Sequence, residues 1–153
     1  TTLVGQSIGA GSRAWARRLG NRVILIAMSY MGGLGLLLGL VSPWTVSLFI
    51  DPSDPLHADV VRIGVTLMWL AGAYQLFDGM ILGASFCLRG AGDATVPALL
   101  ILGLSWCFFV PLAHSLAFAP GQGFVDFLPQ YGLGAAGGWA AAVAYVSLVG
   151  VLM

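Results

Sequence analysis

Long apolar stretches, separated by short polar segments, make up most of this chain. A helix needs about 20 apolar residues to cross a hydrocarbon core of about 30 Å. Four windows have this length, approximately 23–41, 61–88, 96–118 and 133–153, and residues 1–10 are expected to be the last turns of a truncated helix. The 61–88 window is long enough to be tilted or to extend past the bilayer. The pattern predicts an all-α, polytopic membrane helix bundle.

Glycine and proline fall where these spans should end. Residues 9–12 (GAGS) are expected to end the first helix, residues 90–93 (GAGD) to close the third, and residues 120–132 to form a loop. Three prolines are expected to bracket an acidic loop: Pro43, Pro52 and Pro55. Inside the spans, Pro111 should kink its helix, and Gly79 and Gly83 form a GxxxG pair that suits close helix packing.

The few charged residues orient the predicted spans. The chain is 59% hydrophobic and 8% charged. Its net charge of zero argues against a nucleic-acid partner. Cytoplasmic loops collect Arg and Lys. The first loop is expected to hold Arg13, Arg17, Arg18 and Arg22. The second should hold Asp51, Asp54 and Asp59, with Arg62 at its edge; the third has Arg89, and the fourth has no basic residue. The charges therefore predict loops that alternate in, out, in, out.

Asp78 is the exception among the charges because it lies inside a span. It precedes Arg89 by 11 residues, which is about 16 Å along a helix and places it near the bilayer midplane. An ionised carboxylate at that depth costs several kcal/mol, so such residues face a cavity or a partner, or stay protonated. Asp78 is therefore a candidate site for a coupling ion, either H⁺ or Na⁺, with a structural hydrogen bond to another helix as the alternative.

Helical spacing places further polar side chains near the face of Asp78. Tyr74, Gln75 and Ser85 stand at i−4, i−3 and i+7 from it. Such a stripe suits a cavity for cations, because aromatic faces attract positive charge. Gln6 and Trp106 are further candidates for lining this cavity. Each of these residues, taken singly, also fits an interhelical hydrogen bond or a packing role.

An enzymatic function is not expected. Residues 90–93 satisfy the GxGD pattern of intramembrane aspartyl proteases, but such enzymes need two carboxylates close enough to share a proton. Asp78 and Asp93 are 15 residues apart, about 22 Å along one helix. The sequence carries no nucleophile elbow, phosphate loop or zinc motif, so we expect neither catalysis nor a bound cofactor.

Several segments resemble the multidrug-and-toxin extrusion (MATE) transporters, in the family's order. Residues 2–11 (TLVGQSIGAG) are similar to the end of the family's eighth helix, and Asp78 followed by residues 87–93 (CLRGAGD) to its tenth. Within that motif Arg89, Gly90 and Gly92 form the turn. Residues 105–106 (SW) with 110–112 (VPL), and residues 134–139 (GAAGGW), resemble the eleventh helix and the start of the twelfth.

The resemblance implies a function. MATE transporters are twelve-helix antiporters of two lobes that export cationic amphipathic compounds against inward Na⁺ or H⁺ flow. By resemblance, residues 1–153 are helices eight to twelve of the C-terminal lobe, in a bacterial inner membrane, with the N-terminal lobe, the bilayer and cationic drugs as partners. Asp78 matches the family's coupling carboxylate. The alternatives are a lipid-linked oligosaccharide flippase of the same superfamily and a membrane scaffold subunit without transport activity.

Overall fold

The computed structural model describes residues 1–53 and 55–153 and is helical, with no strand among these residues. The helices are α1 (Thr2–Gly9), α2 (Arg13–Ser47), α3 (His57–Gly90), α4 (Thr95–Leu104), the π-helix η1 (Ser105–Phe109), α5 (Val110–Ala117) and α6 (Gly134–Leu152). Four spans are long and apolar enough to cross a membrane: α2, α3, the continuous stretch Thr95–Ala117, and α6. The prediction of an all-α, multi-pass membrane bundle is confirmed.

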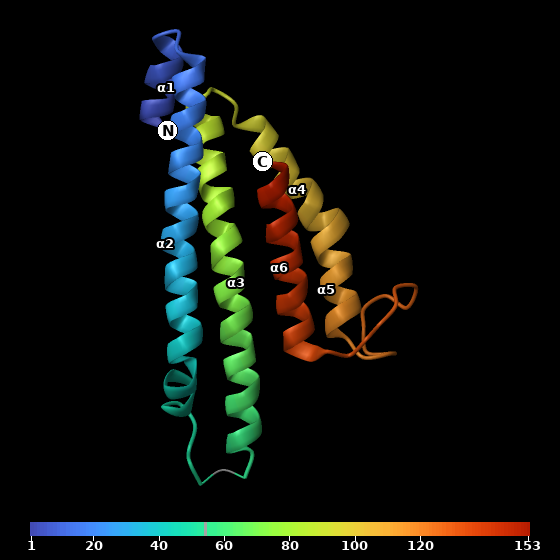
Figure 1. The fold of residues 1–153 in the computed structure, drawn as a ribbon. Helices are drawn as coiled ribbons and strands as arrows, with labels where there is room; N and C mark the ends of the chain where they lie inside the picture. The colour runs from blue at the N-terminus through green and yellow to red at the C-terminus, as the bar shows by residue number, and fades with distance from the viewer. Residues whose placement is uncertain (54) are drawn as a thin grey trace.

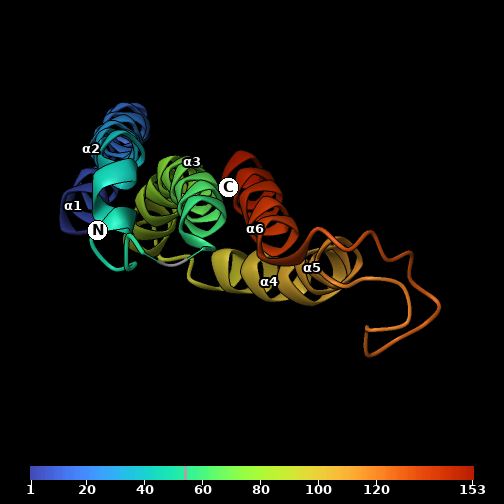
Figure 2. The ribbon, with the colours of Figure 1, turned by 90° about the horizontal axis from the view of Figure 1, so that it is seen from below.

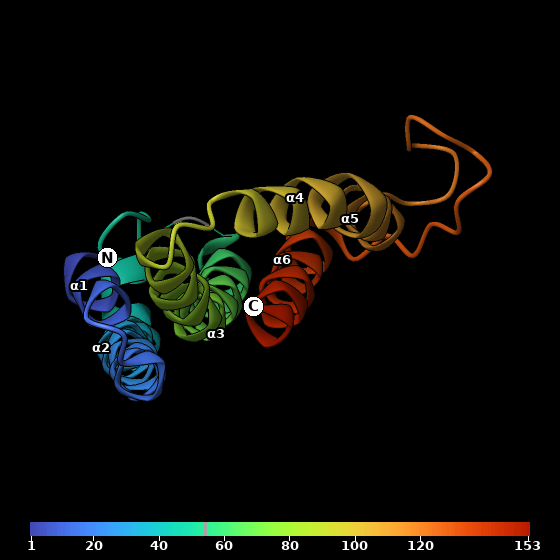
Figure 3. The same cartoon turned by 90° about the horizontal axis from the view of Figure 1, so that it is seen from above.

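The helices stand side by side in a curved row (Figure 1). The long α2 and α3 form an antiparallel hairpin, α6 lies against α3, and the continuous helix of α4 and α5 lies against α6. Seen from below and from above, α3 occupies the middle of the row between α2 and α6 (Figures 2 and 3). Two groups of helices therefore meet on opposite sides of α3.

Glycines let α2 and α3 pack backbone against backbone. A methyl group added to Gly35 would collide with the backbone of Gly72, and one added to Gly72 would collide with that of Gly35. The predicted GxxxG pair takes part, since a Cβ at Gly79 would lie 2.8 Å from the Ala27 carbonyl oxygen. Small residues allow this approach, and van der Waals contact drives helix association in membranes. We name this contact the glycine seam.

Both ends of α2 reach beyond the predicted window of 23–41. The four arginines expected in the first loop lie on the first turns of α2, which begins at Arg13. At the other end Pro43 does not stop the helix, which continues to Ser47. A proline at this position cannot donate to the Gly39 carbonyl. The buried Ser42 hydroxyl donates to that oxygen instead, at 2.7 Å, so the helix continues.

The acidic loop between α2 and α3 is shorter than predicted. Asp59 and Arg62 lie in α3, where they form an exposed ion pair at 3.4 Å. Asp51 precedes the helix, and its carboxylate accepts hydrogen bonds from the Ser53 N–H at 2.9 Å and the Ser53 hydroxyl at 2.7 Å. These bonds lower the pKa of Asp51 below its ordinary value of 3.8. Asp54 lies outside the described residues.

Pro111, in the span Thr95–Ala117, acts as predicted by interrupting regular α-helix. The π-helix η1 precedes Pro111, and the ribbon changes direction between α4 and α5 (Figure 1). Pro111 has no N–H for the carbonyl four residues earlier. A π turn, with its i→i+5 bonding, is a common cause of such bends.

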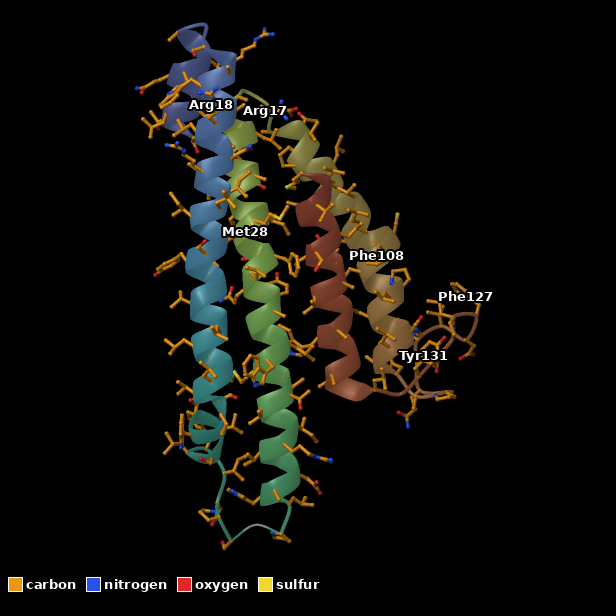
Figure 4. The ribbon with its side chains drawn as sticks, in the orientation of Figure 1. Arg17, Arg18, Met28, Phe108, Phe127 and Tyr131 are labelled. Carbon is orange, nitrogen blue, oxygen red and sulfur yellow. The ribbon has the colours of Figure 1, made fainter. Side chains whose placement is uncertain are left out.

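The predicted loop of residues 120–132 lies between α5 and α6, and a buried histidine fastens it to α5. The Val125 N–H donates to His114 Nε2 at 3.3 Å. The Gln130 side chain accepts from the Gly121 N–H and donates to the Val125 carbonyl. Phe127 and Tyr131 project from this loop beyond the helices (Figure 4).

Candidate functional site

Asp78 lies in the interior of α3, 12 residues before its end at Gly90, which is about 18 Å at 1.5 Å per residue. Its side chain is partly buried. Within residues 1–53 and 55–153 its carboxylate makes no hydrogen bond and no ion pair. A structural hydrogen bond, the alternative role for Asp78, is therefore not formed among the described residues.

A cavity of about 680 Å³ opens one turn from Asp78, between α3, α5 and α6. Tyr74 lies on its α3 side and meets Trp139 of α6 edge to face, with ring centroids 6.1 Å apart. Asp78 follows Tyr74 by four residues, one turn further along α3. The remaining lining residues are Phe109, Ala113, Ala135, Gly138, Ala142 and Tyr145. We call this space the aromatic cavity.

The hydroxyl of Tyr145 connects the cavity to the π-helix. It shares a hydrogen bond of 2.8 Å with the Ser105 hydroxyl and donates to the Ile101 carbonyl at 3.3 Å. Its ring packs against Phe109 at 5.3 Å between centroids. Beside the cavity, Ile81 of α3 contacts the fully buried Val146 and Val149 of α6. The aromatic cavity therefore rests on a small apolar core.

The other residues predicted around Asp78 fall in different surroundings. Tyr74 lines the aromatic cavity, whereas Ser85 is buried two turns away, its hydroxyl 3.5 Å from the Met153 sulfur. Gln75 is partly buried on α3. Gln6 lies in a separate surface pocket formed by α1 and α2, and Trp106 is 68% exposed in the π-helix and does not line the aromatic cavity. The structure brings together Tyr74 and Asp78, and not Gln6 or Trp106.

The predicted turn after α3 has the expected form. The helix ends at Gly90, and Gly92 has a φ of 89°, a left-handed conformation that favours glycine. The Asp93 carboxylate accepts the N–H groups of Thr95 and Val96 at 3.0 Å, capping α4. The Arg89 guanidinium lies 6.0 Å from the centroid of the Phe86 ring. Asp93 therefore bonds to the backbone at the start of α4 and is not paired with Asp78.

The site offers one carboxylate rather than a metal cage. In the part of the chain that the structure describes, no three His, Cys, Asp or Glu residues gather as a metal site would require. A Na⁺ ion at Asp78 would take further ligands from neutral oxygens, such as hydroxyls, carbonyls or water. A proton needs no such set.

Three aromatic residues of the cavity were not predicted as site residues: Phe109, Trp139 and Tyr145. Their signal in the sequence is weak. Tyr145 carries a polar hydroxyl group within an otherwise apolar segment. Periodicity reports which residues share a face of one helix, but not which face of another helix lies opposite.

Comparison with known proteins agrees with the fold. The MatE family model matches residues 1–114. A probable multidrug resistance protein NorM of Brucella suis is 30% identical over 153 residues, which are 100% of this chain and 30% of that protein. The multidrug resistance protein NorM of Burkholderia vietnamiensis is 33% identical over 150 residues, 98% of this chain and 30% of its own. A probable NorM of Pseudomonas aeruginosa is 35% identical over 128 residues, 80% and 25% of the two chains.

The chain spans 30% of the length of the first two of these relatives. No solved structure matches it significantly. The family model, however, covers most of the chain, including Asp78 and the turn at Arg89, Gly90 and Gly92. The resemblance noted in the sequence is therefore confirmed, and this multi-pass membrane chain belongs to the MatE family.

Proposed function

We propose that the chain forms helices eight to twelve of a secondary active antiporter that exports cationic amphipathic compounds. Inward flow of H⁺ or Na⁺ across a bacterial plasma membrane would drive this export. Relatives named for multidrug resistance, and the share of their length that the chain spans, support this assignment. The N-terminal lobe would be supplied by the rest of a longer chain.

One observation carries the proposal: the Asp78 carboxylate is unpaired among the described residues, in mid-helix, one turn from the aromatic cavity. A carboxylate in the middle of a membrane helix is costly, so it is typical of ion pathways and ligand sites. Tyr74, Trp139 and Tyr145 supply the aromatic faces that attract cations. The aromatic cavity would take the apolar part of a cationic amphipathic compound, and Asp78 would attract its positive charge.

The mechanism follows from competition for a single negative charge. When Asp78 holds a proton or Na⁺, it is neutralised and does not attract a cationic drug. When the ion leaves, the carboxylate favours the drug. A ligand shifts a conformational equilibrium only by its differential affinity for the two states. Exclusive occupancy of Asp78 would therefore couple ion entry to drug exit, with Tyr74 contributing a polar group one turn away on α3.

The two alternatives fit these observations less well. A flippase for anionic lipid carriers would be expected to place arginines along its cavity. The arginines of this chain lie near helix ends, at residues 13–22, 62 and 89, and none lines the aromatic cavity. A scaffold subunit would give the mid-helix carboxylate no role.

The decisive test replaces Asp78 in the full-length transporter. Asp78→Asn keeps the shape but cannot titrate, so ion-driven efflux from proteoliposomes should fall to the rate seen without a gradient. Asp78→Glu keeps a titratable group at a displaced position and should retain partial activity. Separately imposed H⁺ and Na⁺ gradients would identify the coupling ion. Wild-type efflux by Asp78→Asn under both gradients would remove the coupling role.

A further inference from the structure

The first turns of α2 carry four arginines in two pairs that point in different directions. Arg13 and Arg17 are spaced i, i+4, and so are Arg18 and Arg22. At roughly 100° per residue, each pair shares a face, and the centres of the two pairs lie about 140° apart around the helix. Figure 4 shows Arg17 toward the turn that joins α3 to α4 and Arg18 on another side of α2.

The first pair borders a pocket and the second does not. A pocket of about 460 Å³ lies where α1, α2, α3 and the end of α6 meet. Its polar lining comes from Arg13, Arg17 and Asn21. The rest of its lining is apolar or uncharged and includes Ile24, Leu88 and Met153. The pocket thus joins a cationic rim to an apolar wall.

No carboxylate among the described residues forms an ion pair with the arginines of this rim. Arg13 and Arg17 are exposed, and within the described ranges neither forms an ion pair. Asp93, in the turn between α3 and α4, accepts hydrogen bonds from the Thr95 and Val96 N–H groups. Two guanidinium groups one turn apart form a fork of donors suited to the oxygens of a phosphate group.

The position of the pocket along the membrane matters as much as its charge. The arginines place this end of the bundle at the cytoplasmic surface, and the apolar part of the lining follows α2 and α3 toward the bilayer core. Basic pockets between membrane helices on this side are suited to anionic lipid headgroups. A free phosphate ion would use the rim but would gain nothing from the apolar wall.

We propose that this pocket binds an anionic phospholipid of the inner leaflet. Arg13 and Arg17 hold its phosphate, Asn21 hydrogen-bonds its headgroup, and an acyl chain lies along Ile24, Leu88 and Met153. The lipid bridges four helices, so it fastens α1 and the end of α6 to the α2–α3 hairpin. The site is separate from the aromatic cavity, which shares no lining residue with it.

The two arginine pairs provide the test and its matched control. Phosphatidylglycerol and phosphatidylcholine with identical acyl chains would be titrated onto the purified full-length transporter and counted by native mass spectrometry. Arg13→Gln with Arg17→Gln should weaken phosphatidylglycerol binding on the order of tenfold. Arg18→Gln with Arg22→Gln removes the same charge from the other face and should weaken it by about twofold or less. The readout does not depend on efflux, so it is independent of the role of Asp78.

A second measurement uses the unaltered protein, in case the double variant does not fold. Arginine-selective modification in nanodiscs of phosphatidylglycerol should spare Arg13 and Arg17 and leave Arg18 and Arg22 reactive, whereas phosphatidylcholine should protect neither pair. Equal weakening by the two double variants, or equal protection of all four arginines, would reduce the site to general surface charge. Displacement of phosphatidylglycerol by an equal concentration of inorganic phosphate would identify a small-anion site instead and overturn the proposal.

Discussion

The two sides of α3 are packed by opposite means. Toward α2 it presents glycines, and the two backbones touch at Gly35 and Gly72 without side chains between them. Toward α6 it presents large side chains, and Tyr74 meets Trp139 across the edge of the aromatic cavity. A pocket of about 320 Å³ lies beside the α2–α3 contact, whereas the large rings on the α6 side border the aromatic cavity of about 680 Å³. The glycine seam holds α2 and α3 together, and the aromatic cavity lies on the other side of α3.

The largest effect should come from adding one methyl group to the seam. Gly35→Ala drives a Cβ into the backbone of Gly72, and neither backbone can move without separating the helices. We expect a loss of about 3 kcal/mol of stability, at the upper end of overpacking costs. Thermal melting of the detergent-solubilised full-length protein would measure it.

Gly33→Ala is the matched control two residues away. A Cβ there has nothing within 4 Å, and alanine favours a helix over glycine by about 0.5–1 kcal/mol. Its melting temperature should stay equal or rise. If Gly35→Ala and Gly33→Ala lose the same stability, close backbone contact at the glycine seam does not stabilise the packing of α2 on α3.

A smaller effect is expected on the cavity side. Tyr145→Phe keeps the ring but removes its hydrogen bonds to Ser105 and the Ile101 carbonyl. The expected loss is about 1 kcal/mol. Tyr74→Phe removes a hydroxyl that makes no hydrogen bond among the described residues, and its melting temperature should change less. The opposite ranking would mean that Tyr145 does not tie α6 to the π-helix.

The smallest effect concerns the loop that joins α2 to α3. Bonds from Ser53 lower the pKa of Asp51 below 3.8, so its stabilising contribution is complete above about pH 4 and is lost as the pH falls through the lower, folded value. Because the carboxylate is fully exposed, the effect is small: acidification through this range should lower the melting temperature of wild type only slightly more than that of Asp51→Asn. A large difference between them would show that the loop, and not the seam, holds the hairpin together.

Hydropathy located the spans but not their ends. Arginines at the start of α2 look like a loop in the sequence, yet their long side chains can reach water from a helix that extends past the hydrocarbon. Pro43 looks like a helix end, and only the Ser42 hydroxyl, bonded to the Gly39 carbonyl, explains why it is not. In both cases residue types that usually mark the end of a helix lie inside one, because a water-exposed helix end or a local hydrogen bond tolerates them.

The candidate site was predicted in part for a related reason. Asp78 and Tyr74 follow from charge and spacing within one helix, and the structure keeps them together beside the cavity. Trp139, Tyr145 and Phe109 come from segments more than 30 residues away, and their meeting depends on how α6 and the π-helix are turned toward α3. Gln6 and Trp106 were chosen by residue type alone, and the structure places both away from the cavity.

The π-helix has a consequence for how other chains of this family are compared with this one. A π turn accommodates one residue more than an α turn, so every side chain after Phe109 is rotated by about 100° from where unbroken α-helical counting would put it. Ala113 lines the aromatic cavity in this rotated frame. A related chain that lacks one residue between positions 105 and 109 would align well in sequence, yet different side chains after this point would face the cavity. Helical positions before and after the π-helix should therefore be numbered separately when the cavity-lining residues of related chains are compared.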